Sequence, residues 1–153
     1  MFLSTFEKQL DGKRRLVVPA EFRALAGPGT GAEGVWVFPS IEADCLEAGG
    51  QGLFDQYRAL IEELPFGDPL RSALETSVFA GMSRLAFDTA GRIVLPEELC
   101  ADFGLADWVV VAGLGDRFQI WSREGFRAHR AAQRLAAREG LAAARNRLRG
   151  TAA

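Results

Sequence analysis

Residues 10–21 read Leu-Asp-Gly-Lys-Arg-Arg-Leu-Val-Val-Pro-Ala-Glu, and residues 87–98 read Phe-Asp-Thr-Ala-Gly-Arg-Ile-Val-Leu-Pro-Glu-Glu. Aspartate, arginine, three aliphatic residues and proline recur in the same order 77 positions apart. Both stretches therefore carry the pattern Asp-x-x-x-Arg followed by an aliphatic run and Pro. Two copies of this unit in one chain of 153 residues predict a fold built by tandem duplication.

The duplication extends beyond the motif. A shift of 72 positions aligns the segment around Trp36 with that around Trp108, so the two tryptophans are expected at equivalent core positions of two strands. The difference of five residues between the two shifts is expected in the Gly-rich segment 27–34, because loops tolerate insertions at low cost. The resulting division is repeat 1 at 5–52, linking helices at 53–80, repeat 2 at 81–124, and a C-terminal helix and tail at 125–153.

The local patterns predict a mainly β fold with helices, of the α+β class. The aliphatic runs 16–18 and 93–95 are expected to be strands buried on both faces and ended by Pro. The apolar spacing of residues 53–64 predicts a helix, and Asp68-Pro69 predicts the start of a second one. Each repeat of about 45 residues is too small to bury a core alone, so the repeats should interlock.

Composition indicates the cellular location of the chain and the redox state of its cysteines. The sequence contains no apolar stretch of about 20 residues and no signal-peptide pattern, so a cytoplasmic protein without a membrane partner is expected. Cys45 and Cys100 lack metal-ligand spacing and are expected to be reduced, structural residues.

The net charge of −2 hides a strong separation of charge. Residues 1–25 carry +2, residues 26–122 carry −10, and residues 123–153 carry +6, with eight arginines against two glutamates. Basic ends around an acidic body are compatible with a local DNA-facing surface. For the arginine stripe of the C-terminal helix, a solvated surface and contact with phosphates both remain open.

Enzymatic chemistry finds no support in the sequence. His129 is the only histidine, and neither a Ser-His-acid set, a phosphate-binding Gly-rich loop nor a metal-spaced carboxylate set is present. We therefore expect no enzymatic activity, no catalytic residues, no metal, no cofactor and no small-molecule substrate.

The repeated motif supports a structural and a functional interpretation together. Aspartate at the head of a turn accepts backbone N–H bonds, and the arginine four residues later can pair with it. Arginine can also read guanine, whereas lysine and turn N–H groups mostly hold phosphates. The residues expected to fix the turns are Asp11, Gly12, Asp88 and Gly91. Those expected to bind DNA are Lys13, Arg14, Arg15 and Arg92, with Lys8 and Arg84 as supporting phosphate contacts.

The chain resembles a known family. The opening Met1-Phe2, residues 10–19, the paired Asp-x-x-x-Arg motifs and residues 118–121 resemble the MraZ family of bacterial regulators, which have two SpoVT-AbrB-like domains of the swapped-hairpin type. The resemblance covers residues 1 to about 130. It implies a pseudo-twofold β-barrel of interleaved hairpins and a ring-shaped homo-oligomer, and it assigns motif roles to Asp11, Arg15, Asp88 and Arg92, with Lys13 at the usual basic position.

The resemblance also implies a function. Such regulators bind repeats in double-stranded DNA upstream of the division and cell-wall gene cluster and mostly repress it, which implies a nucleoid-associated protein. An AbrB-like protein-interaction module or assembly scaffold without specific DNA binding is the alternative. The family usually has Gly before the motif arginine, as at Gly91, but this chain has Arg14 in the first copy. Either Arg14 takes a strained positive φ, at about 1 kcal/mol, or Gly12 takes over the tight position.

Overall fold

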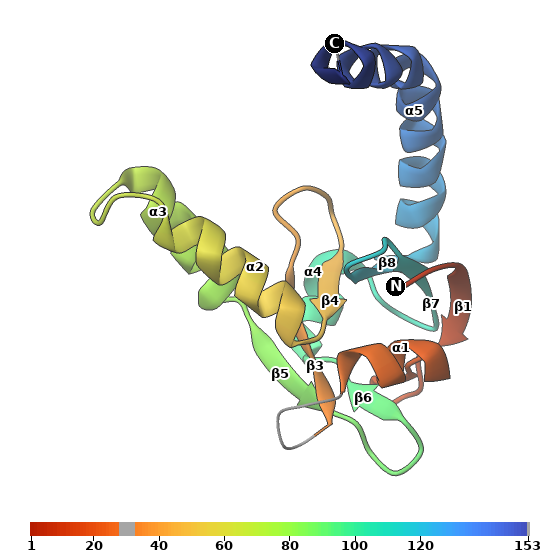
Figure 1. The fold of residues 1–153 in the computed structure, drawn as a ribbon. Helices are drawn as coiled ribbons and strands as arrows, with labels where there is room; N and C mark the ends of the chain where they lie inside the picture. Colours follow the sequence, from red (N-terminus) through yellow and green to blue (C-terminus); the bar gives the residue numbers. More distant parts are fainter. Residues whose placement is uncertain (28–32, 153) are drawn as a thin grey trace. The chain divides into compact units, whose positions relative to one another are not determined.

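The computed structural model of the chain describes residues 1–27 and 33–152 and has the expected α+β fold (Figure 1). The expected Gly-rich insertion falls largely on residues 28–32, which lie outside the described residues. Residues 1–122 form one compact unit, and the C-terminal helix belongs to a second unit. No helix of the described chain is long and apolar enough to cross a membrane.

The elements follow the duplication. The strands are β1 (Thr5–Gln9), β2 (Arg15–Val17), β3 (Gly34–Pro39), β4 (Leu46–Gly49), β5 (Ser83–Ala86), β6 (Arg92–Val94), β7 (Trp108–Gly113) and β8 (Phe118–Ser122). The helices are α1 (Ala20–Ala26), α2 (Gln51–Glu62), α3 (Pro69–Leu74) with a π-helical turn at Glu75–Phe79, α4 (Glu97–Phe103) and α5 (Arg123–Ala152). Asp68 caps α3 through a 2.8 Å bond from Leu70 N, and Pro69 is its first residue, as predicted.

The two repeats exchange strands. The larger sheet has the order β1-β7-β8-β4-β3-β5, and β2 pairs with β6 in a separate ribbon. The first strand of each repeat, β1 or β5, therefore pairs with a strand of the other repeat, β7 or β3. This confirms that the repeats interlock. In the described residues the two sheets do not close into a continuous barrel, so the expected barrel is open along its edge strands.

A pseudo-twofold axis relates the repeats, and the pairing registers locate it. It passes between Leu16 and Ile93 in the ribbon and between Glu47 and Gln119 in the larger sheet, because these partners are equivalent positions of the two repeats. Leu16 and Ile93 have no exposed surface and lie at the centre of the main core.

The registers correct the sequence alignment of the strands. Equivalent positions are 77 residues apart in β1 and β2, 74 apart in β3 and 72 apart in β4. Two of the five extra residues therefore lie in the loop before β4, not in the Gly-rich segment. Trp36 consequently corresponds to Val110, and Trp108 corresponds to Gly34.

The shared core role of the two tryptophans was also wrong. Trp108 is 41% exposed, and Trp36 is half-buried with its ring stacked 5.0 Å from that of Phe54 in α2. The alternate residues Val35 and Val37 of β3 face the main core instead. The two tryptophans differ in exposure because they are two positions apart in the aligned strands. Trp36 lies within β3, whereas Trp108 is the first residue of β7.

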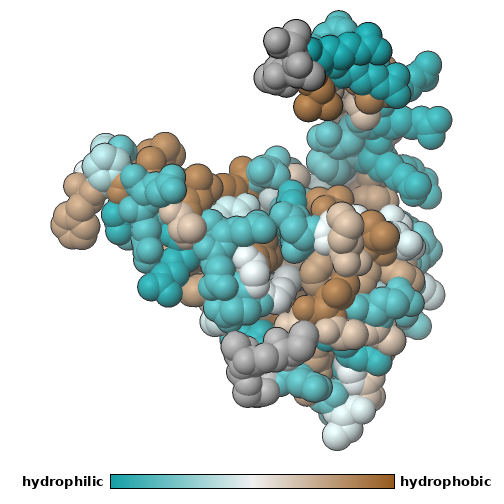
Figure 2. All heavy atoms as spheres, viewed as in Figure 1, coloured by the Kyte–Doolittle hydropathy of each residue, from teal (hydrophilic) through white to brown (hydrophobic). Residues whose placement is uncertain are grey.

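Helix α2 and the π-helical turn pack against the larger sheet over a small second core around Phe38, Leu53 and Ile61. Figure 1 shows the α2–α3 hairpin extending away from the sheet beyond this core. Figure 2 shows hydrophobic side chains along this hairpin. Leu60 is 55% exposed, so the apolar face predicted for residues 53–64 is only partly buried.

Glu47 is a buried carboxylate at the pseudo-twofold axis, with 1% of its surface exposed. Ser40 Oγ (2.9 Å), Arg117 Nε (2.9 Å) and Gln119 Nε2 (2.8 Å) all donate to it. Because the burial of a charge is costly without such partners, this set of donors stabilises the centre of the larger sheet.

We expect Glu47→Leu to lower the free energy of unfolding by about 3 kcal/mol, because it leaves two donors, Arg117 Nε and Gln119 Nε2, without their acceptor. Urea denaturation of the purified variant measures this loss. Glu47→Gln is the matched control, since it keeps an acceptor for Ser40 and should lose less. Equal stability of wild type and Glu47→Leu would contradict the stabilising role of Glu47.

Candidate nucleic-acid interface

The two motif turns have the same hydrogen-bond geometry. Asp11 Oδ1 accepts from the backbone N–H of Lys13 (2.9 Å) and Arg15 (2.8 Å), and Asp11 Oδ2 accepts from Arg15 Nε (2.6 Å). Asp88 accepts the equivalent bonds from Ala90 and Arg92, at 2.9, 2.8 and 2.7 Å. Each aspartate thus fixes both the backbone of its turn and the side chain of its arginine.

These bonds also determine the charge of the aspartates. The backbone N–H of Arg15 holds the pKa of Asp11 below its usual value, and the side chain of Arg15 lowers it further. The pKa of Asp88 is lowered in the same way by Arg92. Both carboxylates are therefore ionised at neutral pH and keep their turns closed.

The ribbon of β2 and β6 presents both motif arginines on one face. Arg15 lies opposite Val94 and Val17 lies opposite Arg92, and directly opposed residues of an antiparallel pair point to the same side. Val17 is 39% and Val94 is 50% exposed, so the prediction of strands buried on both faces was wrong. The buried residues of the ribbon face inward, and its outer face carries two guanidinium groups and two valines.

The outer ribbon face can present hydrogen-bond donors to a ligand. Each motif arginine uses Nε for its aspartate, which leaves four further N–H donors, and each has 32% of its side chain exposed. Diagonal neighbours in such a ribbon are about 7–8 Å apart. A two-stranded ribbon also fits the major groove of B-DNA, which is about 12 Å wide.

The first turn places a non-glycine residue in the left-handed region. Arg14 has φ +59°, and its counterpart Gly91 has φ +75°. Gly12 has no positive φ, so the alternative in which Gly12 takes the tight position is wrong. Arg14 itself adopts the conformation that Gly91 adopts more easily.

Arg14 has a structural role that the sequence did not indicate. Its Nε donates to the carbonyl of Leu95 at 3.0 Å. At the other site the equivalent carbonyl, that of Val18, accepts from Arg23 of α1. The guanidinium of Arg23 fills the space beside Gly91, where a Cβ atom would lie 2.6 Å from it.

The two sites therefore use one arginine each, supplied from different positions. The counterpart of Arg23 in α4 is Cys100, which lines the same surface hollow as Arg14. The pairs Arg14/Cys100 and Gly91/Arg23 are reciprocal in the aligned repeats, and this reciprocity is the sequence signal that could have identified Arg23. It also shows that the guanidinium of Arg14 already has a partner within the protein.

The remaining predicted residues are distributed over two sheets. Lys13 is exposed in the first turn. Lys8 lies on β1 with its ammonium 5.9 Å from the centre of the Phe6 ring, and Arg84 lies on β5 with its guanidinium 5.5 Å from the Trp36 ring. The structure brings the motif residues together at the ribbon but places Lys8 and Arg84 on the edge strands of the larger sheet.

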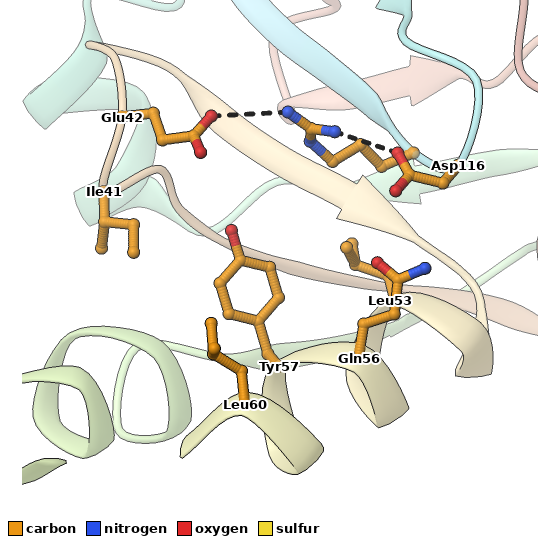
Figure 3. A pocket seen from close by; sticks show the side chains of 8 residues that line it. Ile41, Glu42, Leu53, Gln56, Tyr57, Leu60 and Asp116 are labelled. Atoms are coloured by element: carbon orange, nitrogen blue, oxygen red, sulfur yellow. Dashed lines mark hydrogen bonds and ion pairs between the residues drawn. The ribbon is translucent and has the colours of Figure 1, made fainter. Parts of the chain in front are cut away.

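A cleft of about 320 Å³ lies elsewhere, between α2 and the loops before β4 and β8 (Figure 3). Figure 3 shows Tyr57 and Leu60 projecting from α2 toward it. Arg117 also lines the cleft and binds Glu42 (3.4 Å), Glu47 (2.9 Å) and Asp116 (2.9 Å), so its charge is already neutralised. Burial, followed by the charge of Glu47, raises the pKa of Tyr57, so this phenol is neutral at physiological pH.

The described residues offer little for metal or nucleophilic chemistry. Within them no group of three His, Cys, Asp or Glu side chains could hold a metal ion. Burial raises the pKa of Cys45 to about 12 and also raises that of Cys100, so both cysteines are thiols rather than reactive thiolates. Both are free and buried, as expected for structural residues.

Known proteins resemble the chain over almost its whole length. A family model described as "MraZ protein, putative antitoxin-like" matches residues 78–148. The Transcriptional regulator MraZ of Phenylobacterium zucineum (strain HLK1) is 73% identical over 143 residues, which cover 93% of this chain and 88% of that protein. The protein of the same name from Caulobacter vibrioides (strain NA1000 / CB15N) is 69% identical over 146 residues, covering 95% and 92%. A third, from Hyphomonas neptunium, is 40% identical over 129 residues, covering 84% and 77%.

We expect Cys100→Arg to be tolerated better in an Arg14→Gly background than in the wild type. Arg14→Gly removes a left-handed strain of about 1 kcal/mol but also removes the donor to Leu95. The guanidinium introduced by Cys100→Arg can then supply the missing donor, as Arg23 does at the other site. A double-mutant cycle from urea denaturation measures a favourable coupling of about 1 kcal/mol. Additive effects of the two substitutions would show that a guanidinium at position 100 does not replace the donor lost with Arg14.

The turns also predict a dependence of stability on pH. Because the pKa of Asp88 is lowered in the folded state, its stabilising effect is complete above its unfolded value of about 3.9 and is lost as the pH falls through the folded pKa. We expect wild type to be more stable than Asp88→Asn at pH 7, with a difference that shrinks below about pH 4. Thermal unfolding between pH 3 and 7 measures it. A difference that stays constant with pH would exclude the charge of Asp88 as the cause.

Proposed function

Because the chain belongs to the MraZ family of transcriptional regulators, we propose that it binds double-stranded DNA through the outer face of the β2–β6 ribbon. The chain is a transcriptional regulator, which agrees with the expectation that it is not an enzyme.

One observation carries the proposal: the two exposed motif arginines are held on the same ribbon face by identical aspartate clamps. A side chain fixed before binding loses little conformational freedom on binding, so less of its contact energy is lost to ordering. The clamp uses only Nε of Arg15 and of Arg92, which leaves the N–H donors of their terminal guanidinium nitrogens for a ligand. Such a group can bind guanine O6 and N7 in the major groove.

The other parts of the turns have positioning roles in this proposal. Lys13 is exposed beside Arg15 and can contact phosphate, which fixes the register without reading sequence. Arg14 contributes charge near the DNA but remains bound to the Leu95 carbonyl. Lys8 and Arg84 are assigned supporting phosphate contacts at the edges of the larger sheet.

The family membership extends the proposal to assembly and target. We infer a ring-shaped homo-oligomer that binds tandem repeats upstream of the division and cell-wall gene cluster and represses it at the nucleoid. One ribbon presents few cations, so a single copy should bind weakly and with strong dependence on salt. Several copies aligned on tandem sites raise the apparent affinity through effective concentration.

We expect Arg15→Ala and Arg92→Ala to abolish the preference for the DNA upstream of the protein's own gene over a scrambled sequence. Each should weaken binding to the upstream DNA by about 1–3 kcal/mol per lost base contact. Fluorescence anisotropy with both DNAs over a series of salt concentrations measures affinity and preference together.

Arg15→Lys and Arg92→Lys are the matched controls, because they keep the charge but lose the bidentate geometry. They should retain binding to scrambled DNA and lose preference for the upstream sequence. If the wild type binds both DNAs equally, or if Arg15→Ala keeps the full preference, sequence reading by the ribbon is excluded. A stoichiometric protein partner in that case would favour the interaction module.

A further inference from the structure

The C-terminal helix α5 carries a continuous stripe of arginine. With 3.6 residues per turn, seven of its eight arginines fall within an arc of about 100° and extend about 39 Å along the helix. Neither Glu124 nor Glu139 lies within that arc. The arginines of the stripe are Arg123, Arg127, Arg130, Arg134, Arg138, Arg145 and Arg149.

The stripe is accessible. Every residue from 130 to 150 is exposed, and Figure 2 shows hydrophilic side chains along α5. In the described part of the chain, no salt bridge involves Arg127, Arg134, Arg138 or Arg145. A helix of this composition needs no packing partner to form, because Ala and Arg are strong helix formers. Helix propensity does not depend on the face of the helix that a residue occupies, so it does not explain why seven arginines share one arc.

The rest of the chain lacks the positive charge that DNA binding requires. Residues 1–122 carry ten basic and eighteen acidic side chains, a net charge of −8, whereas residues 123–153 carry +6. The motif arginines are each paired with an aspartate at 2.6 and 2.7 Å, so the second turn has no net charge and the first has +2. Affinity for DNA comes largely from cations that replace counterions on the phosphates.

We propose that the arginine stripe of α5 binds the phosphate backbone of double-stranded DNA and supplies most of the affinity, while the β2–β6 ribbon supplies the sequence preference. This inference rests on the proposed DNA-binding function and deepens it. Arginine suits the role because its planar guanidinium binds phosphate through two parallel hydrogen bonds.

The observations favour DNA over the acidic surface of a second copy. Many carboxylates of residues 1–122 already have partners in their own chain: Asp11, Asp88, Glu62, Glu75, Glu42, Glu47 and Asp116 form ion pairs, and Asp55 and Asp68 accept hydrogen bonds. Half of the eighteen carboxylates of residues 1–122 are therefore already engaged within the chain. DNA offers one negative charge per about 1.7 Å of its axis, so phosphates are present along the whole length of a stripe of about 39 Å.

The test is a full-length variant in which Arg127, Arg134, Arg138 and Arg145 are all replaced by Gln. Glutamine keeps the helix propensity and removes four charges. For both the upstream and the scrambled DNA, we expect the slope of log affinity against log salt to fall by about 3–4 and the affinity near 0.15 M salt to drop at least about tenfold. The ratio between the two DNAs should stay at the wild-type value.

Replacement of the same four residues by Lys is the matched control and should keep the slope near the wild-type value. Circular dichroism and light scattering check the helix and the assembled mass. The single variant Arg134→Gln, with an expected slope change of about 0.9, keeps the test valid if the fourfold variant does not fold.

A wild-type slope in the Gln variants would overturn the proposal. A changed assembled mass with an unchanged slope would also overturn it, in favour of contact with another copy. Failure of the DNA-binding function itself gives a different result, because the wild type would then show no preference for the upstream DNA and Arg15→Ala would have no effect on the ratio.

Discussion

The cross-strand contact between Leu16 and Ile93 is the interaction on which the rest of the body depends. These side chains meet at the pseudo-twofold axis and are fully buried, so the two repeats share one core that neither could complete alone. Because side chains alternate along a strand, burial of these two residues directs Arg15 and Arg92 outward. Hydrophobic burial at the axis and the exposure of both arginines on one face thus have a single cause.

The two repeats differ in the residues that hold their motif turns. Each turn contains a residue with positive φ. At each site a guanidinium also donates to a backbone carbonyl just before the following helix, that of Leu95 or that of Val18. At one site Arg14 supplies both, whereas at the other Gly91 supplies the backbone conformation and Arg23 the guanidinium. The aspartate clamps remain identical despite this, because they position the arginines that the proposal assigns to DNA.

Charge is separated along the chain in a way that fits separate tasks for specificity and affinity. An acidic body repels a polyanion at long range, but salt limits the interaction of exposed charges to about 8–10 Å. In our proposal, a ribbon with fixed arginines therefore reads base edges close to an acidic surface, while the basic helix holds the phosphates. Multiple copies would add the effective concentration that a small ribbon needs.

The sequence by itself determined the duplication, the α+β class, the two turns and their arginines, because order and spacing of Asp, Arg and Pro encode local backbone geometry. It also predicted the helix starting at Pro69 and the Arg-rich C-terminal helix. Only the tertiary structure decided the strand exchange, the exposure of Trp108 and the partner of Arg14, since these depend on register between residues distant in the chain. A shift of two residues leaves a strand pattern unchanged in sequence but places Trp108 at the end of its strand rather than in the middle.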